Sequence, residues 1–175
     1  MELLYEGRCW MLGDDVSSDD LISARHVFEY DPEKLRNHLF EERNPLFARQ
    51  VQAGDIVVAG RRFAHGSQHT HPFLALKAMG VGLMARQMLR PPFRLAVYCG
   101  VPLLEVSDQA YALLNDADRL RVNFKTGEIR NLTSGQVSNV APLPGFLLEI
   151  IQSGGGLGYL KNSRPATSRE ASHDS

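Results

Sequence analysis

The stretch DIVVAGRRFAHGSQHTHPFLALKAMG, residues 55–80, decides the fold. Residues 55–59 form an apolar run typical of a buried strand, which ends at Gly60. Pro72 suits the first residue of a helix, and Gly80 suits the position just after the helix ends. The stretch therefore predicts a strand, a polar loop and a helix in succession.

The rest of the chain continues this alternation of short strands and helices. A helix is expected from the Asp31-Pro32 pair onward, a short helix or turn at 91–94, and a last helix at 144–152 that ends before three glycines. The acidic stretch 13–20 favours a polar loop. Further strands are predicted at 7–12, 81–85 and 101–106, and a hairpin with a glycine turn at 120–132.

Length, composition and charge limit the classes of protein. The 175 residues, 43% of them hydrophobic, predict one domain over residues 1–161 and a disordered, Ser-rich tail over 162–175. A net charge of −1, from 19 basic and 20 acidic residues, gives no reason to expect nucleic acid as a partner. We also expect no membrane association and a cytoplasmic location, because no apolar run approaches about 20 residues and the start lacks the basic region of a secretory signal.

The two cysteines, Cys9 and Cys99, lie far apart in the sequence and in apolar surroundings. This placement favours buried free thiols in a reducing compartment over a disulfide. Two cysteines cannot hold an iron–sulfur cluster unaided.

The loop before the predicted helix is the first candidate for a functional site. The unpaired N–H groups and the positive dipole end of that helix favour an anion beside residues 67–71. Gly66 permits close approach of a ligand, and Ser67 presents a hydroxyl where N–H groups can stabilise a negative charge.

Two other interpretations of this loop stay open. Its residues can serve only as the start of the helix, or the loop's three histidines, His65, His69 and His71, can bind a metal. Their spacing matches no common zinc pattern and no fourth ligand is evident, so we assign no metal site.

The sequence resembles the small subunit of 3-isopropylmalate dehydratase, which is similar to the mobile swivel domain of aconitase. GRCWMLGDDVSSDDLISARH resembles the family's opening, G-R-x-W-x-x-G-D-x-[IV]-x-T-D-x-I-x-x-A-R, and GDIVVAGRRFAHGSQHTHPFLALKAMGV resembles its central motif. The resemblance also takes in RPPFRLAVYCGVPLLE, the KTGEIRN hairpin and PLPGFLLEIIQSGGGLGYLK. Together these segments cover residues 7–161 in the family's order.

The resemblance implies an α/β fold of the aconitase-type swivelling β/β/α class and a heteromeric hydro-lyase. In such enzymes a separate large subunit binds a [4Fe–4S] cluster, and the small subunit closes over it to act on a small carboxylic acid. Ser67 takes the role of the base that removes a proton from carbon, and Asp19 is a candidate for handling the hydroxyl proton or orienting its neighbours. The substrate-binding residues are then expected to be Gly66, Gln68, His69, His71 and Arg90.

The chain departs from the family's pattern in the central motif. Where the family has S-S-R-E-H after the glycine, this chain has Ser67-Gln68-His69-Thr70-His71. Arginine clamps a carboxylate with two parallel hydrogen bonds, whereas histidine offers single donors and is charged only part of the time. Losing such a clamp costs on the order of 2–4 kcal/mol of binding.

Three explanations of this departure remain open. His69 binds a diacid with a different substituent, another arginine supplies the positive charge for the substrate's carboxylate, or the chain has lost catalytic activity. The arginines available for that role are Arg61, Arg62, Arg90 and Arg94.

Three functions follow from these explanations. The first is an active small subunit acting on a hydroxylated di- or tricarboxylic acid, with 3-isopropylmalate of leucine biosynthesis the nearest named substrate. The second is a non-catalytic binding or regulatory subunit that kept the fold. The third is a free-standing metal- or anion-binding protein that uses the histidine loop.

Overall fold

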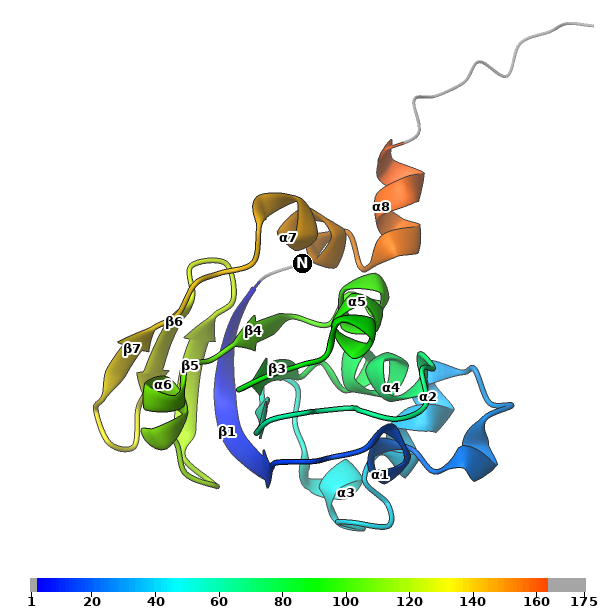
Figure 1. Cartoon of the computed structure of the whole chain (residues 1–175), viewed down its shortest axis with the longest axis horizontal. Coiled ribbons are helices and arrows are strands. Elements are labelled where there is room, and N and C mark those ends of the chain that lie inside the picture. The colour runs from blue at the N-terminus through cyan, green and yellow to red at the C-terminus, as the bar shows by residue number, and fades with distance from the viewer. Residues whose placement is uncertain (1–2, 164–175) are drawn as a thin grey trace, which may run out of the picture.

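The computed structural model describes residues 3–163, which form a seven-stranded sheet in the order β4-β3-β2-β1-β5-β6-β7 (Figure 1). Strands β4, β3, β2 and β1 run parallel to one another. The three remaining pairs, β1 with β5, β5 with β6 and β6 with β7, are antiparallel. The strands are β1 (Leu4–Gly13), β2 (Ile56–Ala59), β3 (Gly82–Ala85), β4 (Leu103–Glu105), β5 (Arg119–Asn123), β6 (Glu128–Asn131) and β7 (Val137–Asn139).

Strand β1 joins the two halves of the sheet. Its residues from Leu4 to Arg8 pair with the antiparallel strand β5, and those from Cys9 to Gly13 pair with the parallel strand β2. A single strand therefore changes partner between Arg8 and Cys9.

The buried carboxylate of Asp55 lies where β1 changes partner. Asp55 is only 5% exposed and accepts hydrogen bonds from the backbone N–H of Arg8 (2.8 Å), the indole Nε1 of Trp10 (2.9 Å) and the backbone N–H of Gln52 (3.0 Å). These three hydrogen bonds hold the start of β2 in place beside the middle of β1.

Helices accompany the parallel half, as the sequence predicts for an α/β protein (Figure 1). The α-helices are α1 (Ser18–Leu21), α2 (Pro32–Leu35), α3 (Phe47–Gln50), α4 (His71–Met79), α5 (Arg90–Cys99), α6 (Asp108–Ala112), α7 (Gly145–Gln152) and α8 (Gly156–Ser163). Two 3-10 helices are η1 (Ala24–His26) and η2 (Arg36–His38). No helix within residues 3–163 has the length and apolar character needed to cross a membrane.

Most of the predicted elements are confirmed. The central strand, the helix that follows it, the N-cap at Asp31 and the hairpin of β5 and β6 all lie where the sequence places them. Both cysteines are free and buried, and burial raises the pKa of each thiol to about 12.

Three expectations need correction. The stretch 13–20 is not all loop, because Ser17 and Asp20 form a capping box that starts α1. The segment at 91–94 belongs to the ten-residue helix α5, whose start at Arg90 is compatible with prolines in the first turn. The chain also continues past the three glycines as α8.

Helix α8 follows from the packing of the glycine triplet against α5. Gly155 has a φ of 109°, and a Cβ there would lie 2.3 Å from the carbonyl oxygen of Tyr98, so the glycine permits a close turn rather than ending the fold. Helix α8 runs to Ser163. It therefore includes the first two residues of the predicted tail, and the rest of that tail lies outside the described residues.

We predict that Asp55→Ala lowers the free energy of unfolding by about 3 kcal/mol or more, because three donors lose a buried carboxylate. Urea unfolding followed by circular dichroism measures this. The control is Asp116→Ala, since Asp116 is exposed and accepts one bond from the backbone of β1, at Met11. Equal losses in the two variants would show that Asp55 has no special role in joining the sheet.

Candidate functional site

Three loops meet at one edge of the parallel half of the sheet. The loop after β2 pairs with the chain after β1, since the N–H of Ser18 donates to the carbonyl of His65 (2.8 Å) and that of Ala64 to Val16 (2.8 Å). It also meets the loop after β3 through a bridge between Phe63 and Met88. Because the carboxyl ends of parallel strands share an edge, this is where ligands bind in open α/β sheets.

Ser67 lies exposed on the loop after β2. The preceding residue, Gly66, has a φ of 99°, which a residue with a side chain rarely adopts. The side-chain amide of Gln68 donates to the carbonyl of Gly66 (2.7 Å) and holds this turn closed. The turn therefore presents the Ser67 hydroxyl to solvent rather than to the core.

The backbone N–H groups around Ser67 are free to bind a ligand. Those of residues 66–70 donate to no acceptor within residues 3–163. Thr70, the N-cap residue of α4, makes no side-chain capping bond. The loop does not act as a side-chain cap for α4, so its free donors and the helix dipole remain available to an anion.

Buried polar atoms without partners cluster beside this loop. Within the described residues they are Ser18 Oγ, His69 Nδ1 and His71 Nδ1. A Cβ on Gly66 would lie 3.4 Å from Ser18 Oγ, and the rings of His69 and His71 are 4.9 Å apart. Because buried polar atoms are normally hydrogen-bonded, these three atoms favour a bound molecule here.

His71 contacts residues 27–30, a segment distant from it in the sequence. It is 2% exposed, its Nε2 donates to the carbonyl of Val27 (3.0 Å), and its ring lies 4.8 Å from that of Tyr30. These contacts leave Nδ1 as the unpartnered nitrogen. His71 therefore orients the loop and holds the segment 27–30 next to it.

The surroundings of His69 favour the neutral form of its imidazole. Burial lowers the pKa of its imidazole, the charge of His71 lowers that pKa further, and Asp19 opposes both effects. The exposed Asp19 thus lies close enough to influence His69 from α1. Its neighbour Asp20 instead completes the capping box, where its carboxylate accepts from Ser17 N and Oγ at 2.8 Å each.

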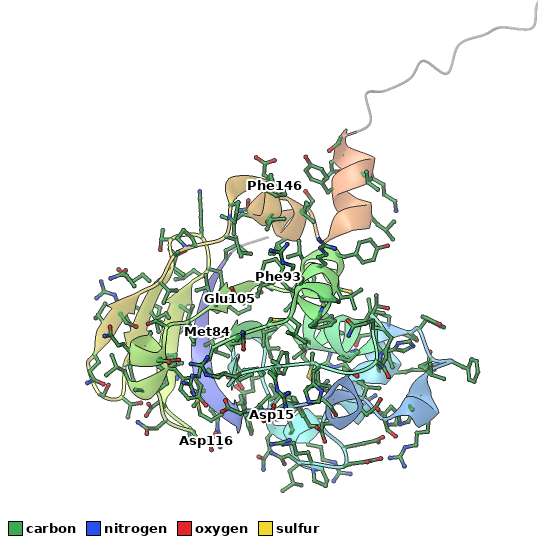
Figure 2. The ribbon with its side chains drawn as sticks, viewed as in Figure 1. Asp15, Met84, Phe93, Glu105, Asp116 and Phe146 are labelled. Carbon is green, nitrogen blue, oxygen red and sulfur yellow. The ribbon has the colours of Figure 1, made fainter. Side chains whose placement is uncertain are left out.

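The structure brings six of the predicted site residues together at the sheet edge, namely Asp19, Gly66, Ser67, Gln68, His69 and His71. Arg90, the first residue of α5, lines an apolar pocket with Phe93, Arg94, Phe146 and Leu147. Phe93 of α5 and Phe146 of α7 are labelled in Figure 2.

The arginines that flank the loop are held in ion pairs. Arg61 contacts Asp108 at 2.7 Å and Arg62 contacts Asp15 at 2.5 Å. Both pairs are exposed and therefore weak, so they do not prevent either arginine from contacting a ligand.

Sequence reasoning missed two features of the site. Ser18 was not singled out, although the pattern from Ser17 to Asp20 has the spacing of a capping box and predicts a helix start there. The packing of Val27 and Tyr30 on His71 has no local signal, because it joins segments more than 40 residues apart.

Comparisons with known proteins place this arrangement in a family. A scan against models of protein families found no match. The chain is 39% identical over 159 residues to 3-isopropylmalate dehydratase small subunit 1 of Archaeoglobus fulgidus, covering 90% of this chain and 98% of the relative. It is 37% identical over 162 residues to the isopropylmalate/citramalate isomerase small subunit of Methanocaldococcus jannaschii, covering 92% and 96%.

A solved structure agrees with these relatives. The crystal structure of a 3-isopropylmalate dehydratase from Methanocaldococcus jannaschii superposes with a TM-score of 0.84 at 26% identity, covering 91% of this chain and 94% of that one. The predicted fold class is thereby confirmed. From the sequence identity, its extent and the shared fold, the chain belongs to the family of 3-isopropylmalate dehydratase small subunits.

Proposed function

We propose that this chain is the small subunit of a hydro-lyase that dehydrates a hydroxylated di- or tricarboxylic acid, with 3-isopropylmalate as the nearest substrate. The observation that carries the proposal is the exposed Ser67 hydroxyl among unpaired N–H groups, at the sheet edge where the family motif lies. The names of the relatives and the solved structure support the same class of activity.

In this proposal the chain needs a large subunit for the metal chemistry. Its two thiols, Cys9 and Cys99, are buried in different elements with raised pKa values, so they do not fit the ligand set of a [4Fe–4S] cluster. A Lewis acid for the substrate's hydroxyl and carboxylate then comes from a cluster on the large subunit.

Ser67 acts as the base toward carbon. Its alkoxide takes a proton from the carbon beside the hydroxyl-bearing carbon, and the C–H electron pair forms the double bond. The hydroxyl group accepts a proton from an acidic group of the assembled site, for which Asp19 is the candidate, and leaves as water. A serine alkoxide is unfavourable in water, but the N–H groups of residues 66–70 can stabilise it. When water adds back in the other orientation, its hydroxyl bonds to the carbon that lost the proton, and Ser67 gives a proton to the carbon that carried the hydroxyl.

The other loop residues bind and orient the acid. The free N–H groups and the dipole of α4 favour a carboxylate, and Gln68 and Gly66 set the turn that exposes them. Burial lowers the pKa of His69 and favours the neutral imidazole, and Asp19 opposes this only in part. The neutral His69 binds a carboxylate more weakly than an arginine does, which supports an acid with a different substituent as a second candidate substrate.

The non-catalytic alternative is less well supported. A subunit that only binds a partner has no need for an exposed hydroxyl beside five free N–H groups and three unpartnered buried polar atoms. These features favour an occupied catalytic site.

We expect Ser67→Ala to lower turnover of the complex reconstituted with its large subunit by about 10²–10⁴-fold, since general-base catalysis contributes that much. Assembly, measured by co-purification, stays intact because Ser67 is exposed and its hydroxyl makes no hydrogen bond within residues 3–163. Ser134→Ala, on an exposed turn after β6, is the matched control. Unchanged turnover in the Ser67 variant would remove this residue from the mechanism.

We expect His69→Arg to shift preference toward 3-isopropylmalate by about tenfold or more over other hydroxy-diacids, because it restores a permanent cation. Relative kcat/KM values in the reconstituted complex measure this. His65→Arg places the same charge four residues away as the control. No change in relative rates would contradict our account of specificity at His69.

The unmodified complex and His69→Arg should also differ in the pH dependence of substrate binding. The pKa of His69 lies below its ordinary value, so this residue gains its charge only as the pH falls below about 6.5. Substrate affinity of the unmodified complex should therefore increase relative to that of His69→Arg as the pH falls through this range. Parallel pH profiles of KM would show that the charge of His69 does not contribute.

A further inference from the structure

Two histidines and one glutamate converge outside the Ser67 loop. His26 ends η1, His38 ends η2, and Glu41 follows η2. One ligand atom from each of these three residues lies within 4.8 Å of the others. His38 and Glu41 are three residues apart, whereas the chain returns over 15 residues to bring Glu41 beside His26. The fold therefore adds His26 to a local pair.

The two imidazoles share the carboxylate. His26 Nε2 lies 2.6 Å from Glu41 Oε1, and His38 Nδ1 lies 2.8 Å from Glu41 Oε2. Their rings stack with centroids 3.9 Å apart and planes at 24°. The side chains are 18%, 37% and 22% exposed for His26, His38 and Glu41, which leaves them sheltered but open to an ion from solvent.

The three side chains offer the donor atoms that a transition metal prefers. To bind an ion, each imidazole has to offer a lone pair, so the proton that it shares with Glu41 moves to the other ring nitrogen or is released. Imidazole with carboxylate is a donor set that suits zinc and its neighbours in the first transition row.

We propose that His26, His38 and Glu41 form a binding site for a divalent transition-metal ion such as Zn²⁺, with the fourth position open to water. In a tetrahedral zinc site with bonds of about 2.0–2.2 Å, the ligand atoms lie roughly 3.4 Å apart. Binding therefore moves the nitrogens of His26 and His38 away from the Glu41 oxygens, which they contact at 2.6 and 2.8 Å, and places the ion between them. Three protein ligands and an open position are compatible with the exposure of the cluster.

Arg25 competes with the metal for this site. Its Nη2 lies 2.7 Å and its Nε 3.1 Å from Glu41 Oε1, and its Nε lies 3.3 Å from His26 Nε2. The side chain is 59% exposed and already lies 3.6 Å from Glu42, so it can turn toward Glu42 when the metal binds. The guanidinium thus sets how tightly the site holds an ion.

A bound metal would restrict the motion of residues 27–30, which contact His71 at the end of the Ser67 loop. Val27 and Tyr30, which contact His71, lie between His26 and His38 in the chain. Closing this loop with a metal restricts the segment to the arrangement seen here. The site therefore lies next to the candidate catalytic site but uses none of its residues.

The test measures binding of Zn²⁺ alone to the full chain by calorimetry, after removal of metal with a chelator. We expect one ion per chain, at least tenfold weaker binding in His38→Gln and in Glu41→Gln, and tighter binding in Arg25→Gln. His65→Gln and Ser67→Ala keep the affinity of the unmodified chain. Co²⁺ in place of Zn²⁺ should give the visible absorption of a four-coordinate site, which His38→Gln loses.

Circular dichroism checks that each variant is folded. Arg25→Gln removes no ligand, so it tests the site even where a ligand variant fails to fold. No binding to either the unmodified chain or Arg25→Gln at about 100 μM Zn²⁺, or equal affinity in folded His38→Gln, would overturn the proposal. Loss of binding in His69→Gln instead would place the ion at the Ser67 loop. No large subunit or substrate is used, so the outcome is independent of the proposed dehydratase activity.

Discussion

The buried carboxylate of Asp55 stabilises the junction of β1 and β2, where the parallel and antiparallel halves of the sheet meet. Strand β1 leaves β5 and joins β2 beside it, and Asp55 binds the backbone of Arg8, the indole of Trp10 and the turn at Gln52. A charged group is costly to bury, but three donors offset that cost and specify one register. The position of β2 relative to β1 follows from this junction.

That register determines where the functional groups lie. Once β1 and β2 are aligned, the chain after Gly13 and the chain after Ala59 leave the same edge and pair through Ser17 and His65. The pairing places Ser18 and Asp19 of α1 beside the loop that carries Ser67. A serine from one βα loop and polar groups from another thus meet at one edge of the sheet.

Much of this arrangement could be predicted from the sequence because its signals are local. The apolar run before Gly60, the proline at position 72 and Gly80 fixed the central strand, loop and helix, and the family motif pointed to Ser67. Helix α8 was missed because the glycine triplet resembles an end of structure, whereas its close contact with the end of α5 is a tertiary effect. The place of Arg90 beside α7 and the meeting of His26 with His38 depend on contacts between distant segments, which one sequence does not reveal.

The central claim is that the Ser67 hydroxyl meets the substrate carbon when the two subunits close. A crystal structure of the chain with its large subunit and an unreactive substrate analogue tests it most directly. The account predicts that Ser67 Oγ lies within about 3.5 Å of the carbon that loses its proton, with N–H groups of residues 66–70 directed at that oxygen. A structure in which Ser67 faces solvent and another side chain occupies that place would contradict it.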